Sequence, residues 1–256
     1  MTGSNLPGRV AWVTGAGKGI GRELARRLSC EGWTVAVSAR TEGDLVSLAA
    51  QCAPGRIVPM PLDVTDLAAT AHTVKAIEEQ CGPIDLAVLN AGTHTPMGAG
   101  DFSVETVRNL METNLMGSVN GLSHLLPRFI GRGAGHIAVV ASVAGYRGLP
   151  SAAAYGASKA ALINMCEALR PELDGHGVRL TLINPGFVDT PLTSRNDFPM
   201  PFLISADKAV EYIMRGLNGN AFEITFPRRF AALMKILRIL PDRLFFALTR
   251  RMVRNE

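Results

Sequence analysis

Short apolar, β-branched runs alternate with longer helical patterns along most of this 256-residue chain. Two of these runs are typical of strands that are buried on both faces: RVAWVT at 9–14 and IDLAVLN at 84–90. We predict strands at 9–14, 34–39, 56–63, 84–90, 136–142, 178–184 and 222–226. We predict helices at 19–30, 42–51, 66–80, 104–130, 152–174 and 206–217. This alternation predicts an α/β fold, a doubly wound parallel sheet of about seven strands with helices on both faces.

The composition fits one folded domain of this kind. Hydrophobic residues make up 47% of the chain and charged residues 19%, which excludes a disordered polymer. We assign residues 1–226 to a single catalytic domain that includes a substrate lid at about 187–206, where prolines break every periodic pattern.

No leader peptide or membrane span is expected, and the four scattered cysteines suit free thiols, so we expect a cytoplasmic protein.

Residues 227–256 form a basic extension. They hold eight Lys or Arg and two acidic residues, a net charge of +6 in a chain whose total is +4. Two amphipathic helices are predicted, at about 228–240 and 243–253, separated by Pro241. The first helix is expected to place Phe230, Leu233, Leu237 and Leu240 on one face. Three roles stay open: packing on the substrate side or on a partner subunit, contact with an anionic membrane surface at the inner face of a membrane, or admission of an acidic or acyl substrate.

A glycine-rich turn, TGAGKGIG at 14–21, joins the first predicted strand to the first helix. Glycine lets the backbone turn tightly and approach a diphosphate, and the following helix N-terminus offers unpaired N–H groups. The candidate phosphate-binding residues are Gly15, Gly17, Lys18, Gly19, Ile20 and Gly21. Because this turn lies between a strand and a helix, it indicates a Rossmann-type dinucleotide site.

The end of the second strand indicates which dinucleotide binds. An NAD site usually has an acidic residue there that binds the ribose 2′-hydroxyl, whereas this strand ends in Ser38-Ala39-Arg40. Arg40 would bind a 2′-phosphate through charge-assisted hydrogen bonds, and Lys18 would reach the same group. Asp44 is nearby but is expected to begin the next helix. We therefore predict NADPH or NADP as the cofactor, with NAD less favoured.

YGASK at 155–159 places Tyr155 and Lys159 one turn apart on a helix face. A free tyrosine has a pKa near 10, and a nearby cation favours the phenolate and so lowers that pKa. Ser142 ends the preceding strand, where its hydroxyl would hydrogen-bond a substrate carbonyl. Asn114 lies within an otherwise helical stretch, where asparagine is mildly unfavourable, so it has either a functional role or a buried polar contact.

These motifs occur together in the order and spacing of a known family. The chain resembles the short-chain dehydrogenase/reductase superfamily, in its short single-domain subgroup, from about Arg9 to Thr190. The motifs that carry the resemblance are TGAGKGIG, Asp63-Val64, NAG at 90–92, Asn114, Ser142, YGASK and NPGFVDT at 184–190. The basic extension is not covered by it with any specificity.

The resemblance implies a role for each matching residue. Tyr155 would be the general acid in reduction and the base in oxidation, Lys159 would lower its pKa, and Ser142 would polarise the carbonyl. Asn114 would hold a water molecule in a proton relay. Asp63 and Val64 would bind adenine. Further cofactor contacts are implied for Asn90, Ala91, Gly92, Pro185, Gly186, Val188 and Thr190.

The predicted activity is NADPH-dependent interconversion of a ketone or aldehyde and an alcohol, on a hydrophobic substrate, with no metal. Apolar substrate walls are expected at 93–97, at 143–150, at Phe187 and in the lid, with polar contacts from His94, Tyr146 and Arg147 if these are not ordinary rim residues. A 3-oxoacyl-thioester reductase, or an idle dinucleotide-sensing protein, stays an alternative. By resemblance we expect a homodimer or homotetramer that pairs the two long helices, and no nucleic-acid partner.

Overall fold

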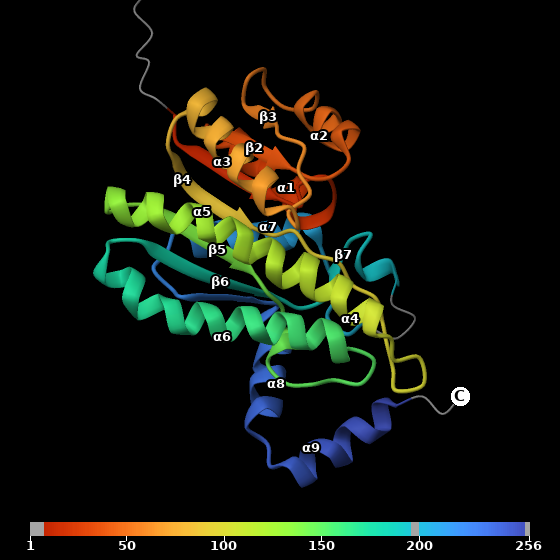
Figure 1. Ribbon diagram of the computed structural model, residues 1–256. Helices are drawn as coiled ribbons and strands as arrows, with labels where there is room; N and C mark the ends of the chain where they lie inside the picture. The colour runs from red at the N-terminus through yellow and green to blue at the C-terminus, as the bar shows by residue number, and fades with distance from the viewer. Residues whose placement is uncertain (1–7, 196–199, 254–256) are drawn as a thin grey trace, which may run out of the picture.

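The computed structural model describes residues 8–195 and 200–253. Within them, the central sheet has seven parallel strands in the order β3-β2-β1-β4-β5-β6-β9 (Figure 1). The strands are β1 (Val10–Thr14), β2 (Thr34–Ser38), β3 (Ile57–Pro59), β4 (Ile84–Leu89), β5 (His136–Val140), β6 (Arg179–Pro185) and β9 (Glu223–Phe226). The predicted parallel α/β sheet is therefore confirmed.

Strand β1 shows why the sequence forms buried strands. Its five residues are all buried, and Val13 lies between Val37 of β2 and Val88 of β4. Successive side chains of a strand point to opposite faces, so Trp12 enters one hydrophobic core and Val13 the other. An almost unbroken apolar run is what this two-sided burial requires.

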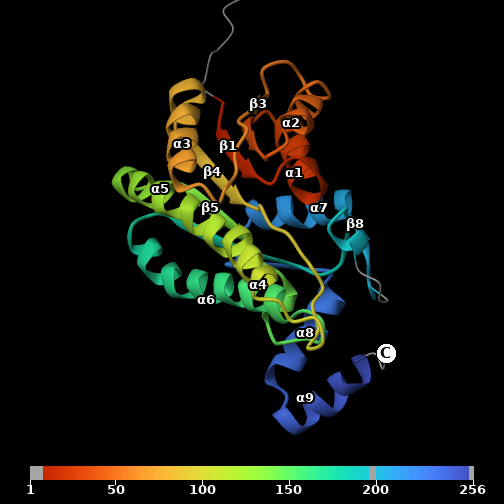
Figure 2. The same cartoon turned by 45° about the vertical axis from the view of Figure 1, so that its right-hand side comes forward.

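Helices cover both faces of the sheet (Figures 1 and 2). Apolar residues of α3, α5 and α6 form one core with the sheet, and those of α1, α2 and α7 form the other. These helices are α1 (Gly19–Cys30), α2 (Glu42–Ala49), α3 (Leu67–Cys81), α5 (Gly117–Arg132), α6 (Ala153–Gly175) and α7 (Ala206–Leu217). Their crossovers bring the carboxyl ends of the parallel strands to one edge, where ligands bind in such sheets.

Two predicted elements differ from the structure. The strand expected at 56–63 is reduced to the three residues of β3, because its last residue is Pro59 and Pro61 follows, and proline cannot donate to a ladder. The single helix expected at 104–130 is interrupted. It consists of α4 (Val104–Met111), a π-helical turn η1 (Glu112–Met116) and α5, and the turn contains Asn114.

The segment predicted as a lid has more regular structure than its sequence suggested. Strands β7 (Val188–Asp189) and β8 (Ile204–Ser205) pair in parallel, and a 3-10 turn, η3 (Thr193–Arg195), lies between them. Phe198 and Pro199, which we expected in the apolar lid, lie outside the described residues.

The basic extension is helical, as predicted, with α8 (Arg228–Ile239), α9 (Asp242–Thr249) and a 3-10 turn η4 (Arg250–Met252). Figure 1 shows α8 and α9 below α6, outside the two helical layers of the sheet. The predicted inner face of the first helix was partly wrong: Phe230, Ala231 and Met234 are buried, whereas Leu233 is exposed. In the described part of the chain, no helix has both the length and the hydropathy needed to cross a bilayer.

Candidate active site

The glycine turn after β1 is held tightly against the end of β4. The Asn90 side-chain amide donates to the carbonyl oxygens of Thr14, at 2.9 Å, and Gly15, at 3.3 Å. Gly15 has a φ of +66°, and a Cβ there would lie 2.8 Å from the Cα of Ala91. Only glycine combines this left-handed conformation with so close an approach. The Asn90 side chain therefore stabilises the turn, in addition to its predicted contact with the cofactor.

The N-terminus of α1 fits the diphosphate of a dinucleotide. Within this fully described helix, Lys18 at the N-cap makes no side-chain capping bond and the first turn has no acidic residue. The N–H groups of the first turn therefore lack a side-chain acceptor and lie at the positive end of the helix dipole. A Cβ on Gly19 would lie 3.1 Å from Cγ2 of Thr190, which brings the predicted Thr190 to this turn.

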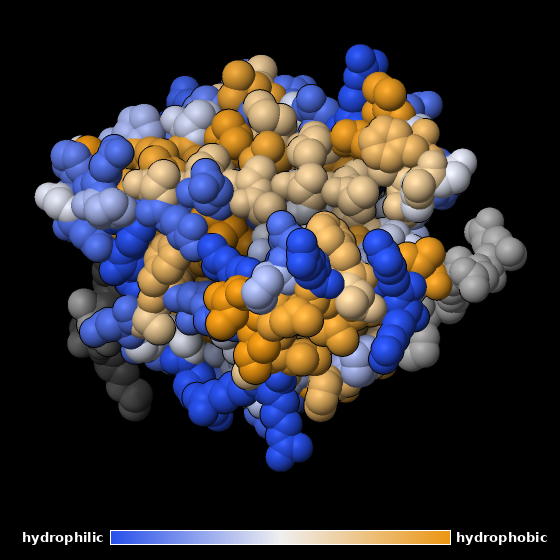
Figure 3. Space-filling model, turned by 90° about the horizontal axis from the view of Figure 1, so that it is seen from below, coloured by the Kyte–Doolittle hydropathy of each residue, from blue (hydrophilic) through white to orange (hydrophobic). Residues whose placement is uncertain are grey.

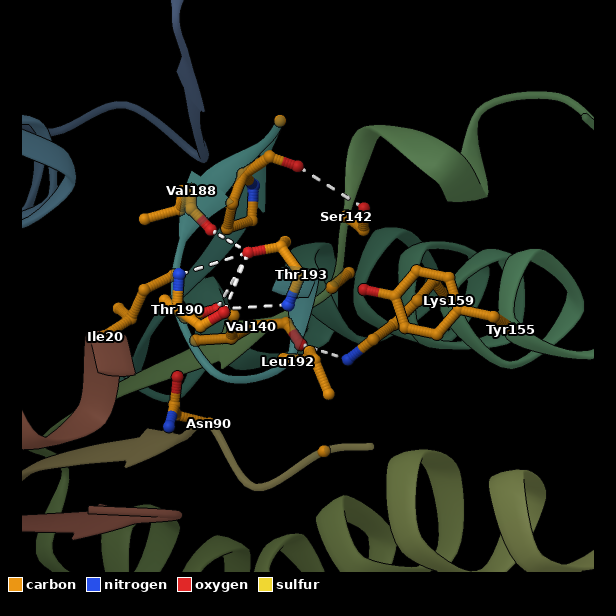
Figure 4. A pocket seen from close by; sticks show the side chains of 14 residues that line it. Ile20, Asn90, Val140, Ser142, Tyr155, Lys159, Val188, Thr190, Leu192 and Thr193 are labelled. Atoms are coloured by element: carbon orange, nitrogen blue, oxygen red, sulfur yellow. Dashed lines mark hydrogen bonds between the residues drawn. The ribbon is translucent and has the colours of Figure 1, made fainter. Parts of the chain in front are cut away.

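Three of the four predicted catalytic residues, Ser142, Tyr155 and Lys159, line one pocket at the carboxyl edge of the sheet. Figure 4 shows the hydroxyl groups of Ser142 and Tyr155 facing this cavity, with Lys159 beside Tyr155. The Lys159 ammonium donates to the carbonyl oxygen of Val140, at 2.9 Å, and lies 5.8 Å from the centre of the Tyr155 ring. The other lining residues are Ile20, Asn90, Gly92, Ala141, Pro185, Gly186, Val188, Thr190, Leu192 and Thr193.

Burial dominates the electrostatics of this pocket. It raises the pKa of Tyr155, an effect that hydrogen bonding with Ser142 partly offsets. Burial also lowers the pKa of Lys159 to about 8. The expected lowering of the tyrosine pKa by Lys159 is therefore not found, because desolvation of the phenolate outweighs the other effects on Tyr155.

Asn114 is fully buried in the π-helical turn, where its side chain joins two parts of the site. Its Oδ1 accepts from the Thr93 N–H at 2.7 Å, and its Nδ2 donates to Thr93 O and to Ser158 Oγ, both at 3.0 Å. The Ser158 hydroxyl in turn donates to the Tyr155 carbonyl oxygen at 2.7 Å. This is the buried polar contact that was one of our two interpretations, and the water relay stays a prediction.

Gly92 makes room for this polar cluster. A Cβ at Gly92 would lie 3.3 Å from Asn114 Oδ1 and 3.5 Å from Lys159 Nζ. A larger side chain would push apart the two polar groups that lie beside it.

The predicted adenine-binding residues follow β3. Asp63 accepts hydrogen bonds from the N–H and hydroxyl of Thr65, at 3.0 and 2.8 Å. The bond from the Thr65 N–H is the main cause that lowers the pKa of Asp63, with a smaller contribution from the charge of Arg40. Val64 is buried, and its Cγ2 lies 2.5 Å from where a Cβ of Gly117 would be.

Lys18 and Arg40, the predicted 2′-phosphate contacts, differ in their surroundings. Arg40 is exposed, whereas Lys18 pairs with the Asp44 carboxylate at 3.7 Å. Asp44 lies in the first turn of α2, as expected, but its carboxylate still reaches the glycine turn. Sequence reasoning missed Arg22, which donates to the Asp44 carbonyl at 2.8 Å and so connects α2 to this turn. The position of Arg22, one helical turn after Lys18, was the signal that could have identified it.

Thr193 is another residue that sequence reasoning missed. Its hydroxyl donates to the Val188 carbonyl at 2.6 Å and accepts from the Thr190 N–H at 3.1 Å, which folds the start of the lid over the pocket. The Thr-Pro-Leu-Thr spacing at 190–193 is typical of a side-chain-stabilised turn and was a usable signal.

Tyr146 and Arg147, proposed as polar substrate contacts, bind the C-terminal region instead. The Tyr146 hydroxyl donates to Glu223, which also accepts from Asn184 at 2.8 Å and from Lys235 of α8 at 2.5 Å. Burial raises the pKa of Glu223, but the hydrogen bonds from Lys235, Tyr146 and Asn184 outweigh it and hold that pKa below its usual value. A carboxylate with three donors fixes α8 to the loop that lies between Ser142 and Tyr155.

Arg147 fixes the junction of the two C-terminal helices. Its guanidinium donates to the carbonyl oxygens of Leu237, at 2.8 Å, and Leu240, and pairs with Asp242 at 2.6 Å. It also lies 3.9 Å from the centre of the Phe245 ring. One arginine thereby satisfies the C-terminal carbonyl groups of α8 and holds the start of α9.

The inner face of α8 extends the apolar side of the pocket. The Phe230 ring lies 5.3 Å from that of Phe187 and 6.1 Å from that of Phe202 in the lid. A Cβ on Gly186, which lines the pocket, would lie 2.7 Å from the Phe230 ring. The extension therefore packs beside this pocket, and its role stays a prediction.

This arrangement defines a class of dinucleotide-fold oxidoreductases. Its features are a parallel sheet, a glycine turn after β1, and Ser, Tyr and Lys together at the carboxyl edge of the sheet. The family model described as short chain dehydrogenase matches residues 9–198. The chain belongs to the short chain dehydrogenase family, and the predicted resemblance is confirmed.

Individual relatives agree with this assignment. An uncharacterized oxidoreductase of Myxococcus xanthus is 42% identical over 246 residues, which span 95% of this chain and 97% of the relative. A short chain dehydrogenase of Burkholderia cenocepacia, solved in complex with NADP, superposes with a TM-score of 0.82 at 30% identity, over 97% of this chain and 98% of that one. A Burkholderia phymatum member in complex with NAD has a TM-score of 0.81 at 25% identity, over 89% and 92% of the two chains.

Proposed function

We propose that this protein interconverts a hydrophobic ketone or aldehyde and the corresponding alcohol, with NADPH or NADP as its cofactor. The observation that carries the proposal is the convergence of Ser142, Tyr155 and Lys159 on one pocket beside the glycine turn. A nicotinamide dinucleotide, when bound, supplies or accepts the hydride at the carbonyl carbon.

The protein's own residues handle the oxygen and its proton. The Ser142 hydroxyl orients the carbonyl oxygen toward the Tyr155 hydroxyl, which gives its proton to that oxygen in reduction and takes it back in oxidation. The positive charge of Lys159 favours the phenolate form of Tyr155 over the neutral phenol. After reduction, Lys159 passes a proton to the Tyr155 phenolate, and a water molecule held by Asn114 returns a proton to Lys159.

The cofactor preference rests on the cations at the end of β2. Arg40 is exposed and forms no ion pair within the described residues, so it is available to a 2′-phosphate; Lys18 would move from Asp44 to the same group. Arg40→Ala should weaken NADPH binding by tenfold or more, about the worth of a charge-assisted pair, and leave NADH binding nearly unchanged. Titration of both cofactors tests this, and equal losses for the two would refute the NADPH assignment.

The substrate class rests on the apolar wall. Phe187, Phe202 and Phe230 pack together next to Gly186, so the side of the pocket that faces the lid and α8 favours an apolar group. We therefore expect a hydrophobic carbonyl compound rather than a sugar or a small hydroxy acid.

The decisive experiment compares Tyr155→Phe with the wild type, after a screen of ketones and alcohols with both cofactors has identified a substrate. Loss of a general acid lowers turnover by about 10²- to 10⁴-fold. Cofactor binding should persist, because the phenol ring stays in place. Retained turnover would refute the mechanism, and absence of turnover in the wild type on every carbonyl class would favour the idle sensing protein.

A further inference from the structure

The C-terminal helices expose a large apolar surface. Eight large hydrophobic side chains between residues 233 and 253 are 45–80% exposed, while Phe230, Met234 and Phe245 are buried. We call the exposed set the outer apolar face; it consists of Leu233, Ile236, Ile239, Leu244, Phe246, Leu248, Met252 and Val253. An apolar surface of this kind on a water-exposed helix pair indicates an interaction site.

Basic side chains border this face. Those at 228, 229, 238, 243, 250 and 251 are all exposed arginines. Within 228–253 the only acidic residue is Asp242, and it pairs with Arg147. Figure 3, viewed from the end of the molecule where α9 lies, shows hydrophobic side chains gathered at the centre with hydrophilic ones around them. Seven basic residues thus stand against one carboxylate within 228–253, so this segment has a strong positive charge.

The helices are also held in place, so that the face is preformed. Arg147 and the Glu223 cluster attach α8 and the start of α9 to the catalytic domain through hydrogen bonds and ion pairs. The outer apolar face is not what holds these helices; their inner residues do so.

Charge decides between two occupants of this face. A second copy of the chain would bring the same arginines opposite one another, and like charges repel across an interface. An anionic bilayer instead attracts them, while the apolar side chains between them enter the boundary between headgroups and acyl chains. We propose that the outer apolar face binds the surface of an anionic lipid membrane.

The proposal predicts how binding depends on lipid and salt. The full chain should cosediment with phosphatidylcholine vesicles that contain phosphatidylglycerol, and poorly with phosphatidylcholine alone. Recovery should fall as salt is added, because salt screens the arginines. Each basic residue near an anionic surface raises partitioning roughly fivefold, so Arg238→Gln/Arg243→Gln should weaken binding by roughly 25-fold.

A matched pair of variants tests the apolar part. Leu233→Ser/Ile236→Ser removes two side chains of the outer apolar face and should reduce vesicle binding by about tenfold or more. Val46→Ser/Leu67→Ser removes two similarly exposed side chains elsewhere and should leave binding unchanged. Thermal unfolding of both double variants checks that each is folded.

Several results would overturn the proposal. Equal recovery with and without phosphatidylglycerol would remove the role of charge, and unchanged recovery of Leu233→Ser/Ile236→Ser would remove the role of the face. If the wild type does not bind vesicles but sediments as an oligomer that Leu233→Ser/Ile236→Ser dissociates, the face is an interface between copies. If it neither binds lipid nor loses an oligomer, an acidic protein partner takes the place of the membrane.

Discussion

The pocket around Tyr155 and the helix pair α8–α9 are held in the fold by different means. The pocket is formed by the ends of β4, β5 and β6 together with α1 and α6, and glycines allow backbone to approach backbone closely there. The helix pair is attached through side chains, by one arginine, one carboxylate cluster and the buried Phe230 and Met234, and leaves an apolar face exposed. Backbone packing fixes positions rigidly, whereas side-chain attachment tolerates change.

The two regions are nevertheless connected by one loop. Tyr146 and Arg147, which hold α8 and α9, lie between Ser142 and Tyr155 in the chain. A substitution in this loop can therefore alter the C-terminal helices without touching the catalytic groups. The four predictions below separate the two regions, beginning with the largest expected effect.

Lys159→Met should lower turnover and at the same time raise the free energy of unfolding. Turnover should fall by at least about 10²-fold, because the charge that favours the Tyr155 phenolate is lost. The folded protein should nevertheless become more stable at pH 7, by about 1–3 kcal/mol, since burial lowers the pKa of Lys159 to about 8 and the charged form is unfavourable there. Chemical denaturation measures this change.

The pH dependence of that gain follows from the lysine pKa. In the unfolded chain the pKa stays near 10.5, so between pH 8 and 10.5 the unfolded state binds more protons than the folded one. The penalty of burying Lys159 is therefore complete below pH 8 and disappears as the pH rises to 10.5. The stability difference between Lys159→Met and wild type should shrink over this window; a constant difference would contradict the assignment.

Gly21→Ala tests the backbone packing of the pocket. A Cβ at Gly21 would lie 2.5 Å from both Asn90 Nδ2 and the Gly15 carbonyl oxygen, so we expect a loss of about 1–3 kcal/mol in unfolding free energy together with weaker cofactor binding. Gly43→Ala is the matched control, because Gly43 is also helical but has open space around it. That variant should gain about 0.5–1 kcal/mol; a loss in both would point to a general intolerance of helical alanine instead.

Arg147→Ala should loosen the helix pair and spare the pocket. Removing the guanidinium leaves the Leu237 and Leu240 carbonyl groups without their donor, at about 1–3 kcal/mol of local stability. Backbone amide hydrogen exchange at residues 237–249 should be faster than in the wild type, while amide exchange in β4 and β5 stays unchanged. Arg229→Ala, at an exposed position on α8, is the control and should change neither. Uniform acceleration would show that the two regions unfold together.

Asp242→Asn should have the smallest effect. Asp242 is largely exposed, so its ion pair with Arg147 is worth about 0.2–1 kcal/mol and is screened by salt. Hydrogen exchange in α9 should rise slightly at low ionic strength and match the wild type at high ionic strength. An effect as large as that of Arg147→Ala would mean that the ion pair, rather than the carbonyl contacts, holds the helices.

Much of the fold and the pocket was predictable from local patterns. Gly15, Asn90, Ser142 and Pro185 each stand at or just after the end of a predicted strand, and parallel strands end at one edge, so their convergence follows from topology. The roles of these residues in catalysis and cofactor binding stay predictions, as does the oligomeric state.

Other features were beyond sequence reasoning for identifiable reasons. The π-helical turn at Asn114 arises where the helix meets Thr93 and Ser158, which lie far away in the chain. The inner face of α8 was misassigned because both faces of that helix carry large apolar residues, so hydrophobic periodicity does not select one. Leu233 and Met234 are neighbours in the chain, yet only Met234 is buried.

By itself, the sequence determined the parallel α/β fold, the family, and the edge of the sheet at which the glycine turn, Ser142, Tyr155 and Lys159 come together. These depend on short-range periodicity and on spacing within single strand–helix units. Only the tertiary structure decided that Tyr146 and Arg147 hold the C-terminal helices, that Phe230 packs against Gly186, and which apolar residues face outward. Those outcomes depend on contacts between residues as much as about 90 positions apart, whose energies no local pattern encodes.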